Sequence, residues 1–175
     1  TPSREGKKYF VKTFGCQMNE HDSEKIAGMF ELDGMTKATL EDSADIMFIN
    51  TCTIRENADD RLYGTLGQLK KWKDEGIDRK LLVGGCAAQK DKELVRERAP
   101  WVDVVIGTHN LTNIINLLNQ SEDWGPITEI IDEIEDLPTD APSIRESEHS
   151  AWLTIQIGCN NSCTFCIVPS VRGPE

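Results

Sequence analysis

Short apolar runs alternate with longer amphipathic stretches over the first 120 residues of this chain. Runs rich in Val, Ile and Phe, without strict alternation, are typical of strands buried on both faces of a parallel sheet. Four runs are clear and the fifth is weaker: KYFVKT at 8–13, DIMFIN at 45–50, LLVGG at 81–85, DVVI at 103–106, and TKATL at 36–40.

Helices are predicted between these strands, because apolar positions there recur at helical spacing. Strands that alternate with helices indicate a parallel α/β sheet with right-handed crossovers. We predict a flavodoxin-like, doubly wound sheet of about five strands over residues 1–120. Four helices are expected. The first runs from an N-cap at Asn19 to Gly34, and the second follows a capping-box pattern of Thr53 and Glu56. The third covers 89–98, and the fourth follows Thr108.

The pattern changes after residue 120. Residues 121–150 contain three prolines, ten acidic residues and one Arg, so they are predicted to form an acidic linker with one short strand at 127–131. Residues 151–175 begin with WLTIQI at 152–157, which predicts a strand that leads into Cys159. We interpret this last part as the start of a second domain.

Charge and hydropathy narrow the classes of function. The net charge is −11, but outside the acidic linker the chain carries 20 acidic and 18 basic residues. The body is therefore near neutral and shows no basic nucleic-acid footprint. No apolar run reaches the roughly 18 residues of a membrane span. The amino-terminal TPSREGKKYF lacks the apolar core of a secretory signal, so we expect a soluble, cytoplasmic protein with reduced thiols.

The first three cysteines each follow a predicted strand. Cys16, Cys52 and Cys86 are 36 and 34 residues apart, about one strand–helix unit each. The carboxyl ends of parallel strands share one edge of the sheet, where ligands bind. Three thiolates on that edge suit an iron–sulfur cluster with one iron that lacks a protein ligand. Zinc, with His21 or His109 as fourth ligand, and three unrelated buried thiols are the alternatives.

The second three cysteines form a compact C-x3-C-x2-C loop of Cys159, Cys163 and Cys166. Three thiolates on eight residues can surround one side of a cubane cluster and leave one iron open to a substrate or cofactor. Zinc with His149 as a distant fourth ligand is one alternative. A disulfide with one free thiol is the other.

These motifs resemble those of the radical S-adenosylmethionine methylthiotransferases, from about residue 7 to residue 175. The loop region GCNNSCTFCIVPSVRG is similar to the cluster motif of that family. The segments TFGCQMNEHDSE, INTCTIRENADDRLYG, VGGCAAQKDKEL and RAPWVDVVIGTHNL resemble its amino-terminal domain. Within the family, Gln17-Met18-Asn19 favours the branch that acts on N6-isopentenyladenosine in tRNA.

The resemblance implies two [4Fe–4S] clusters and S-adenosylmethionine as cofactors. Cys159, Cys163 and Cys166 would hold the radical cluster, whose electron cleaves S-adenosylmethionine to a radical that abstracts hydrogen from C2 of the adenine. Cys16, Cys52 and Cys86 would hold an auxiliary cluster that carries the transferred sulfur, and a second S-adenosylmethionine would supply the methyl group. Phe165 would lie near the cofactor adenine or simply pack.

The resemblance also implies partners and limits. The partners would be tRNA and an electron donor such as flavodoxin or ferredoxin, and the protein would be a monomer. Most of the radical domain and an RNA-binding domain would lie beyond residue 175, so this chain alone is expected to be inactive. Sibling branches, which act on a ribosomal-protein aspartate or on threonylcarbamoyl-adenosine in tRNA, are alternatives. Two further alternatives to an enzyme are a binding scaffold without chemistry of its own and an electron carrier with two clusters.

Three further polar residues near the cysteines are singled out. Asn19 and Asn50 are interpreted as capping residues, with hydrogen bonds to cluster sulfurs as the alternative. Arg172 is expected to be solvated, with a contact to phosphate or cofactor as the alternative.

Overall fold

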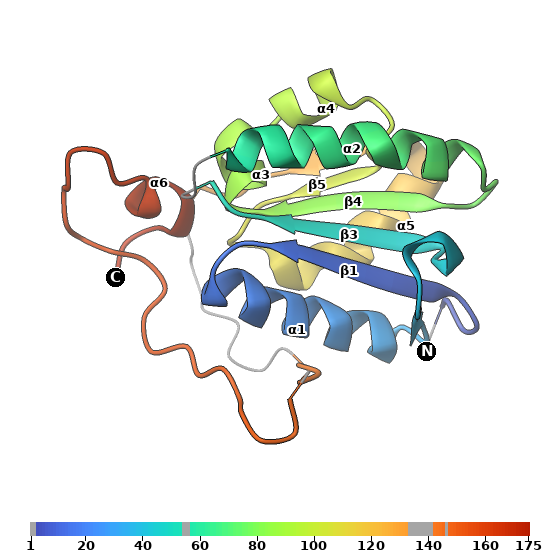
Figure 1. The fold of residues 1–175 in the computed structure, drawn as a ribbon, viewed down its shortest axis with the longest axis horizontal. Coiled ribbons are helices and arrows are strands. Elements are labelled where there is room, and N and C mark those ends of the chain that lie inside the picture. The colour runs from blue at the N-terminus through green and yellow to red at the C-terminus, as the bar shows by residue number, and fades with distance from the viewer. Residues whose placement is uncertain (1–2, 54–56, 133–141, 146) are drawn as a thin grey trace.

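The computed structural model describes residues 3–53, 57–132, 142–145 and 147–175 (Figure 1). The strands are β1 (Lys8–Phe14), β2 (Thr36–Lys37), β3 (Ile46–Thr51), β4 (Lys80–Gly85), β5 (Val104–Ile106) and β6 (Ile127–Glu129). The α-helices are α1 (Gln17–Leu32), α2 (Ala58–Asp74), α3 (Cys86–Asp91), α4 (Leu94–Arg98), α5 (Ile114–Trp124) and α6 (Val168–Arg172). Two 3-10 turns are η1 (Glu41–Ser43) and η2 (Leu111–Asn113).

The described strands form one sheet in the order β2-β1-β3-β4-β5-β6, and every pair in it is parallel. The chain passes from β1 outward to β2 and then returns to β3 on the other side, so the order reverses between β1 and β3. That reversal is the topological switch point of a doubly wound sheet. The flavodoxin-like prediction is confirmed, with six strands in place of about five.

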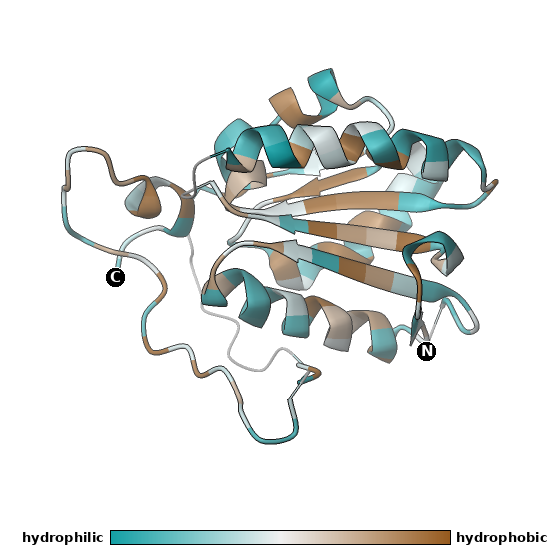
Figure 2. Cartoon of the chain, viewed as in Figure 1, coloured by the Kyte–Doolittle hydropathy of each residue, from teal (hydrophilic) through white to brown (hydrophobic). Residues whose placement is uncertain are grey.

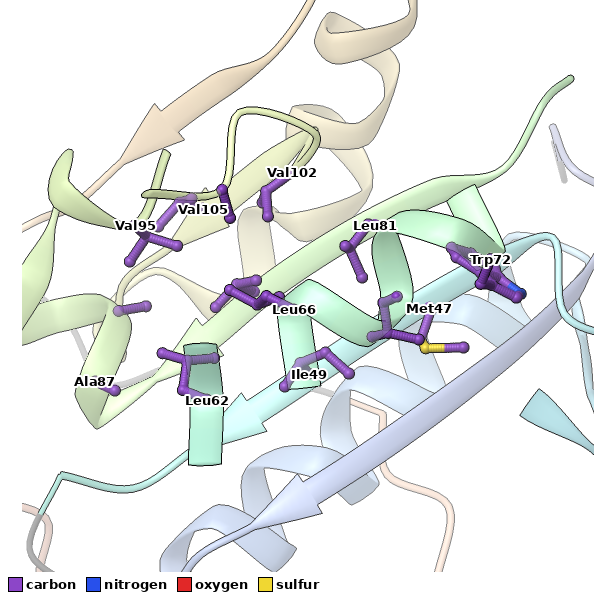
Figure 3. Packing of buried hydrophobic residues seen from close by; sticks show 14 of the residues in the cluster. Met47, Ile49, Leu62, Leu66, Trp72, Leu81, Ala87, Val95, Val102 and Val105 are labelled. Atoms are coloured by element: carbon purple, nitrogen blue, oxygen red, sulfur yellow. The ribbon is translucent and has the colours of Figure 1, made fainter. Parts of the chain in front are cut away.

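Helices cover both faces of the sheet (Figure 1): α2, α3 and α4 lie on one face, and α1 and α5 on the other. Figure 2 shows apolar stretches along the strands between these two layers. Consecutive residues of β3 serve opposite faces, since Met47 and Ile49 pack with Leu66 of α2, whereas Phe48 packs with Phe30 of α1. Figure 3 shows the first of these two clusters around Leu66. A strand buried on both faces explains why the apolar runs do not alternate.

Several helix boundaries differ from the predictions. The first helix begins at Gln17, with Cys16 and not Asn19 as N-cap, while Gly34 follows its end with φ +92° as expected. The single helix predicted over 89–98 is two short helices, because Lys92 between them has φ +51°. The second helix follows Asn57, and Glu56 of the expected capping box lies outside the described residues.

Two predictions concern the carboxyl-terminal half. The short strand expected at 127–131 is confirmed as β6, which pairs with β5 and so belongs to the main sheet. The strand expected at 152–157 is wrong, since these residues pair with no other strand in the described part of the chain. Leu153 and Ile155 are exposed, and a strand requires a neighbouring strand that accepts and donates its backbone hydrogen bonds.

Over the described parts of the chain, no helix combines the length and the apolar character that a membrane crossing requires.

Candidate metal centre at the carboxyl edge of the sheet

Three cysteines lie on one edge of the sheet, directly after three neighbouring strands. Cys16 follows β1, Cys52 follows β3, and Cys86 is the first residue after β4. The strand ends are in register, because Phe14 pairs with Thr51 and Thr51 pairs with Gly85. Neighbouring strands are about 4.7–4.9 Å apart, so the three residues meet on one rim beside the switch point. The predicted placement of these cysteines on one edge of the sheet is confirmed, and the convergence of their thiol groups on one ligand stays a prediction.

The chemistry of these three side chains fits a cluster held by thiolates. All three are free thiols, and Cys52 and Cys86 are buried. Thiolates are the protein ligands of [4Fe–4S] clusters, and zinc also binds them. Within the described ranges, however, no three His, Cys, Asp or Glu side chains are grouped closely enough to hold a metal ion. The assignment of these cysteines as ligands therefore stays a prediction.

A buried pair of asparagines fixes Cys16 relative to the neighbouring strand. Asn19 Oδ1 accepts hydrogen bonds from the backbone N–H of Cys16 at 3.2 Å and from its Sγ at 3.5 Å. Asn19 Nδ2 donates to Asn50 Oδ1 at 2.9 Å and to the Thr51 carbonyl at 3.2 Å. Asn50 Nδ2 donates back to the Asn19 carbonyl at 2.8 Å and to Ser23 Oγ at 2.9 Å. The start of α1 is thus tied to the end of β3 next to Cys52.

This network modifies the capping prediction for the two asparagines. Asn19 does satisfy a backbone donor at the start of α1, but it does so from the third helical position as part of a capping box. Among the described residues, the Asn50 side chain caps no helix and instead links β3 to α1. The alternative role for Asn19 was a hydrogen bond to a sulfur that ligates a cluster. The contact between Asn19 and the Cys16 sulfur is the observation that supports this alternative.

Gly85 allows the end of β4 to lie close against the end of β3, next to Cys52 and Cys86. Its backbone has φ +92° and ψ −169°, a conformation that residues other than glycine almost never adopt. A Cβ on this residue would overlap Asn50 Oδ1 and the Thr51 carbonyl oxygen. The strand β4 can therefore turn into α3 at Cys86 while its backbone stays against the end of β3.

The Cys86 thiol lies beside Arg172, which the sequence interpretation placed in solvent. Arg172 is 3% exposed, and its Nε donates to Cys86 Sγ at 3.2 Å. Its Nη1 forms a buried ion pair with Asp22 Oδ2 at 2.7 Å. Burial raises the pKa of the Cys86 thiol above its ordinary value, and Arg172 acts in the opposite direction. The solvated interpretation of Arg172 is wrong, because α6 carries it into the space between α1 and α3.

The second set of cysteines lies at the same end of the sheet, in the loop before α6 (Figure 1). Cys163 and Cys166 are exposed, and Cys159 is half-buried. The loop is closed by the Cys159 N–H, which donates to the Gly173 carbonyl at 3.1 Å, and by the Cys166 N–H, which donates to the Cys163 carbonyl at 3.2 Å. The structure therefore orders the loop without disulfides among the described cysteines, and its role as a cluster site stays a prediction.

Phe165 points away from the described chain. It is 96% exposed, so the simple packing role that was one of its two predicted roles is wrong for the described residues. The proposed contact with S-adenosylmethionine stays a prediction. An exposed aromatic side chain between two cysteines is available to a ligand of the loop.

Two of the three histidines that were considered as fourth zinc ligands line a cavity, and the third is exposed. His21 and His109 line a cavity of about 200 Å³, together with Arg172 and the segment 152–157, while His149 is exposed. Burial lowers the pKa of His21 and of His109 below the ordinary value of 6.5. None of the three histidines joins the cysteines in a metal-ligand group within the described chain.

A protein-family model described as "Uncharacterized protein family UPF0004" matches residues 8–107 of this chain. The matched range contains Cys16, Cys52 and Cys86 and the strands β1 to β5. The family model therefore covers strands β1 to β5 and the first cysteine set, but neither β6 nor the second cysteine set.

Relatives match over nearly the whole chain. A tRNA-2-methylthio-N(6)-dimethylallyladenosine synthase of Corynebacterium jeikeium (strain K411) is 52% identical over 171 residues, which cover 97% of this chain and 33% of that protein. The protein of the same name from Tropheryma whipplei (strain Twist) is 54% identical over 95% of this chain and 36% of its own length. That of Mycobacterium bovis is 51% identical over 95% of this chain and 33% of its own length. The chain thus spans about a third of the length of these relatives.

Proposed function

The chain belongs to the UPF0004 family, and on this premise we propose that it is part of an enzyme that adds a methylthio group to C2 of N6-isopentenyladenosine, also called N6-dimethylallyladenosine, in tRNA. One observation carries the proposal: relatives with that name are 52% and 54% identical to this chain. The first match covers 97% of the chain in one span, so it includes both cysteine sets. Their name favours this substrate over a ribosomal-protein aspartate or threonylcarbamoyl-adenosine.

The cysteines supply the ligands in this proposal. Cys16, Cys52 and Cys86 would hold an auxiliary [4Fe–4S] cluster, and Cys159, Cys163 and Cys166 would hold the cluster that binds S-adenosylmethionine. When bound, these groups supply one-electron chemistry, sulfur and the methyl group.

The other residues of the site orient these ligands. Asn19 and Asn50 fix the backbone around Cys16 and the end of β3, and Gly85 permits the turn into Cys86. Phe165 would contact S-adenosylmethionine. The protein is proposed to act as a cytoplasmic monomer with tRNA as substrate and with a flavodoxin or ferredoxin as electron donor. We expect these 175 residues alone to leave tRNA unmodified, because they span about a third of the relatives' length.

Reconstitution separates the proposed enzyme from a zinc scaffold. The purified chain is incubated anaerobically with iron and sulfide, and its iron, sulfide and zinc are counted. Two [4Fe–4S] clusters require about eight irons per chain and a broad absorption band near about 400 nm. Stoichiometric zinc without colour would contradict the cluster assignment.

A chimera tests the reaction itself and separates the enzyme from an electron carrier. The matched third of the Corynebacterium jeikeium protein is replaced by this chain and expressed in a bacterium that lacks its own methylthiotransferase. Mass spectrometry of digested tRNA should then show the methylthio derivative of isopentenyladenosine. The control is the same chimera with Cys52→Ala, which should fold and leave the nucleoside unmodified. A soluble chimera that contains both clusters and produces no methylthio derivative would contradict the proposed function.

A further inference from the structure

Arg172 joins three parts of the molecule that are far apart in sequence. It ends α6, six residues after Cys166, and its side chain reaches both Cys86 at the start of α3 and Asp22 of α1. In the sequence, Arg172 is 86 positions away from Cys86 and 150 positions away from Asp22. The segment that follows the second cysteine loop is thereby attached to the rim that carries the first cysteine set.

The arrangement is built around the geometry of a guanidinium group. A buried guanidinium needs an opposite charge, and Asp22, which is itself 8% exposed, provides it at 2.7 Å. With Nη1 held by the carboxylate, the planar group points Nε at the Cys86 sulfur. Nη2 is also buried, and it has no hydrogen-bond partner within the described parts of the chain. The group therefore holds one sulfur and keeps a further donor available beside it.

Backbone contacts fix the helix that carries Arg172. Thr108 Oγ1 donates to the Val171 carbonyl at 2.5 Å, and Val171 is buried. On the other side, the Cys159 N–H donates to the Gly173 carbonyl, and a Cβ on Gly158 would overlap that carbonyl oxygen. A continuous path of contacts thus runs from Cys159 through Gly173 and Arg172 to Cys86.

We propose that Arg172 is a positioning residue of the Cys86 site, which holds the Cys86 sulfur through an N–H···S hydrogen bond and fastens the C-x3-C-x2-C loop to the rim of the sheet. The part that concerns a bound cluster rests on the proposed function. Hydrogen bonds and positive charge at a ligand sulfur stabilise the reduced, more negative state of a cluster and so raise its reduction potential. The part that concerns the loop holds for the chain without metal.

The first test measures the reduction potential of the cluster held by the first cysteine set. Cys159, Cys163 and Cys166 are replaced by Ala so that one cluster remains, and Arg172→Met, Arg172→Lys and Arg145→Met are compared in that background. Arg172→Met should shift the potential to more negative values. Arg172→Lys should give an intermediate shift, because it keeps the charge but cannot bond the thiol and Asp22 in one plane. Arg145 is exposed and serves as the matched control, which should not change the potential.

The second test needs no cluster. Hydrogen exchange is followed at the amides of Cys159 and Gly173, which both donate backbone hydrogen bonds in this region. In the metal-free chain with all six cysteines, Arg172→Met should accelerate exchange at both amides, and Arg145→Met should not. Gly158→Ala should also accelerate it, since the added methyl group separates the loop from Gly173 without touching Arg172.

The two measurements give distinguishable failures. A chain that binds no cluster contradicts the proposed function, while the exchange experiment still tests the attachment of the loop. A folded Arg172→Met variant with an unchanged potential overturns the N–H···S role. Unchanged exchange at Cys159 and Gly173 overturns the attachment. Circular dichroism of each variant confirms that the sheet is intact.

Discussion

At the scale of single residues, the rim depends on two buried asparagines, Asn19 and Asn50, whose hydrogen-bond partners are supplied by the fold. Asn19 and Asn50 are fully buried, and each uses its amide group as donor and acceptor at once. A polar group of this kind is stable only where its partners are complete, because each unsatisfied partner costs about 1–3 kcal/mol. Their reciprocal bonds therefore make the start of α1 and the end of β3 one rigid unit.

Asn50→Ala should lower the free energy of unfolding by about 1–3 kcal/mol, because it removes the acceptor for Asn19 Nδ2 and the donor to the Asn19 carbonyl. Urea unfolding followed by circular dichroism measures the change. The control is Asn116→Ala, an exposed amide whose bond to Asn113 lies at the surface, and it should change stability little. Equal effects of the two substitutions would contradict the structural role of Asn50.

Gly85→Ala should destabilise the protein by about 2–4 kcal/mol, since it combines a strained backbone conformation with overlap against Asn50 and Thr51. Gly64→Ala is the matched control: Gly64 lies in α2, and a Cβ there would meet no atom within 4 Å. That substitution should raise stability by about 0.5–1 kcal/mol through helix propensity. Thermal and urea unfolding of the pair would reveal opposite signs, and a shared sign would count against this account of Gly85.

At the scale of secondary-structure elements, the sequence predicts what depends on burial from both faces. The runs at 8–13, 45–50, 81–85 and 103–106 become β1, β3, β4 and β5 with shifts of a residue or so at their ends. Their apolar character reflects their central place in the sheet, so it is visible without the structure. The helices between them can be predicted by the same argument, because the apolar stripe of each helix is buried against a face of the sheet.

Elements that depend on a particular neighbour are less visible in the sequence. The break between α3 and α4 lies at Lys92, whose φ of +51° no composition rule predicts. Residues 152–157 have the apolar pattern of a strand, but no described strand lies beside them. Apolar pattern indicates which side chains can be buried, and only pairing decides whether a ladder forms.

An ion pair that joins α1 and α5 to the amino terminus predicts a pH dependence. Arg4 contacts Asp33 at 2.6 Å and Glu122 at 2.9 Å, and both Arg4 and Asp33 are buried. Burial alone would raise the pKa of Asp33, but hydrogen bonds from Ser3 and Arg4 lower it below its ordinary value of 3.8. A lowered pKa means that the ionised carboxylate stabilises the folded state above pH 3.8, and that this contribution is lost as pH falls through the folded-state pKa.

Asp33→Asn should therefore be less stable than the parent protein at about pH 6, by about 1.5–3 kcal/mol for hydrogen bonds to a charged group. The difference should shrink when both proteins are compared at about pH 3. Urea midpoints at the two pH values measure it. Asp78→Asn, at an exposed carboxylate 3.9 Å from Lys7, is the control and should show little difference at either pH. A gap that stays constant down to low pH would show that Asp33 contributes by shape and not by charge.

At the scale of the whole molecule, the placement of the first three cysteines on one edge of the sheet follows from topology alone. Spacings of 36 and 34 residues place one cysteine after each strand–helix unit, and a parallel sheet brings those strand ends to one edge. The contact of Arg172 with Cys86 follows from no such rule, because it depends on how a short helix after the second loop packs between α1 and α3. The apolar pattern of the sequence is enough to predict the sheet. Contacts between irregular segments that are distant in sequence can be found only from the structure.

The two cysteine sets lie on different elements, and their positions predict that each set binds its own iron although Arg172 links the second loop to the rim. The first set follows strands of a rigid sheet, and the second lies on a loop closed by its own backbone hydrogen bonds. Replacing Cys16, Cys52 and Cys86 by Ala should therefore reduce the iron of the reconstituted chain from about eight to about four atoms. Replacing Cys159, Cys163 and Cys166 should have the same effect, and replacing all six should leave none. If either triple substitution abolished all iron while circular dichroism still showed a folded sheet, the two sets would form one shared site.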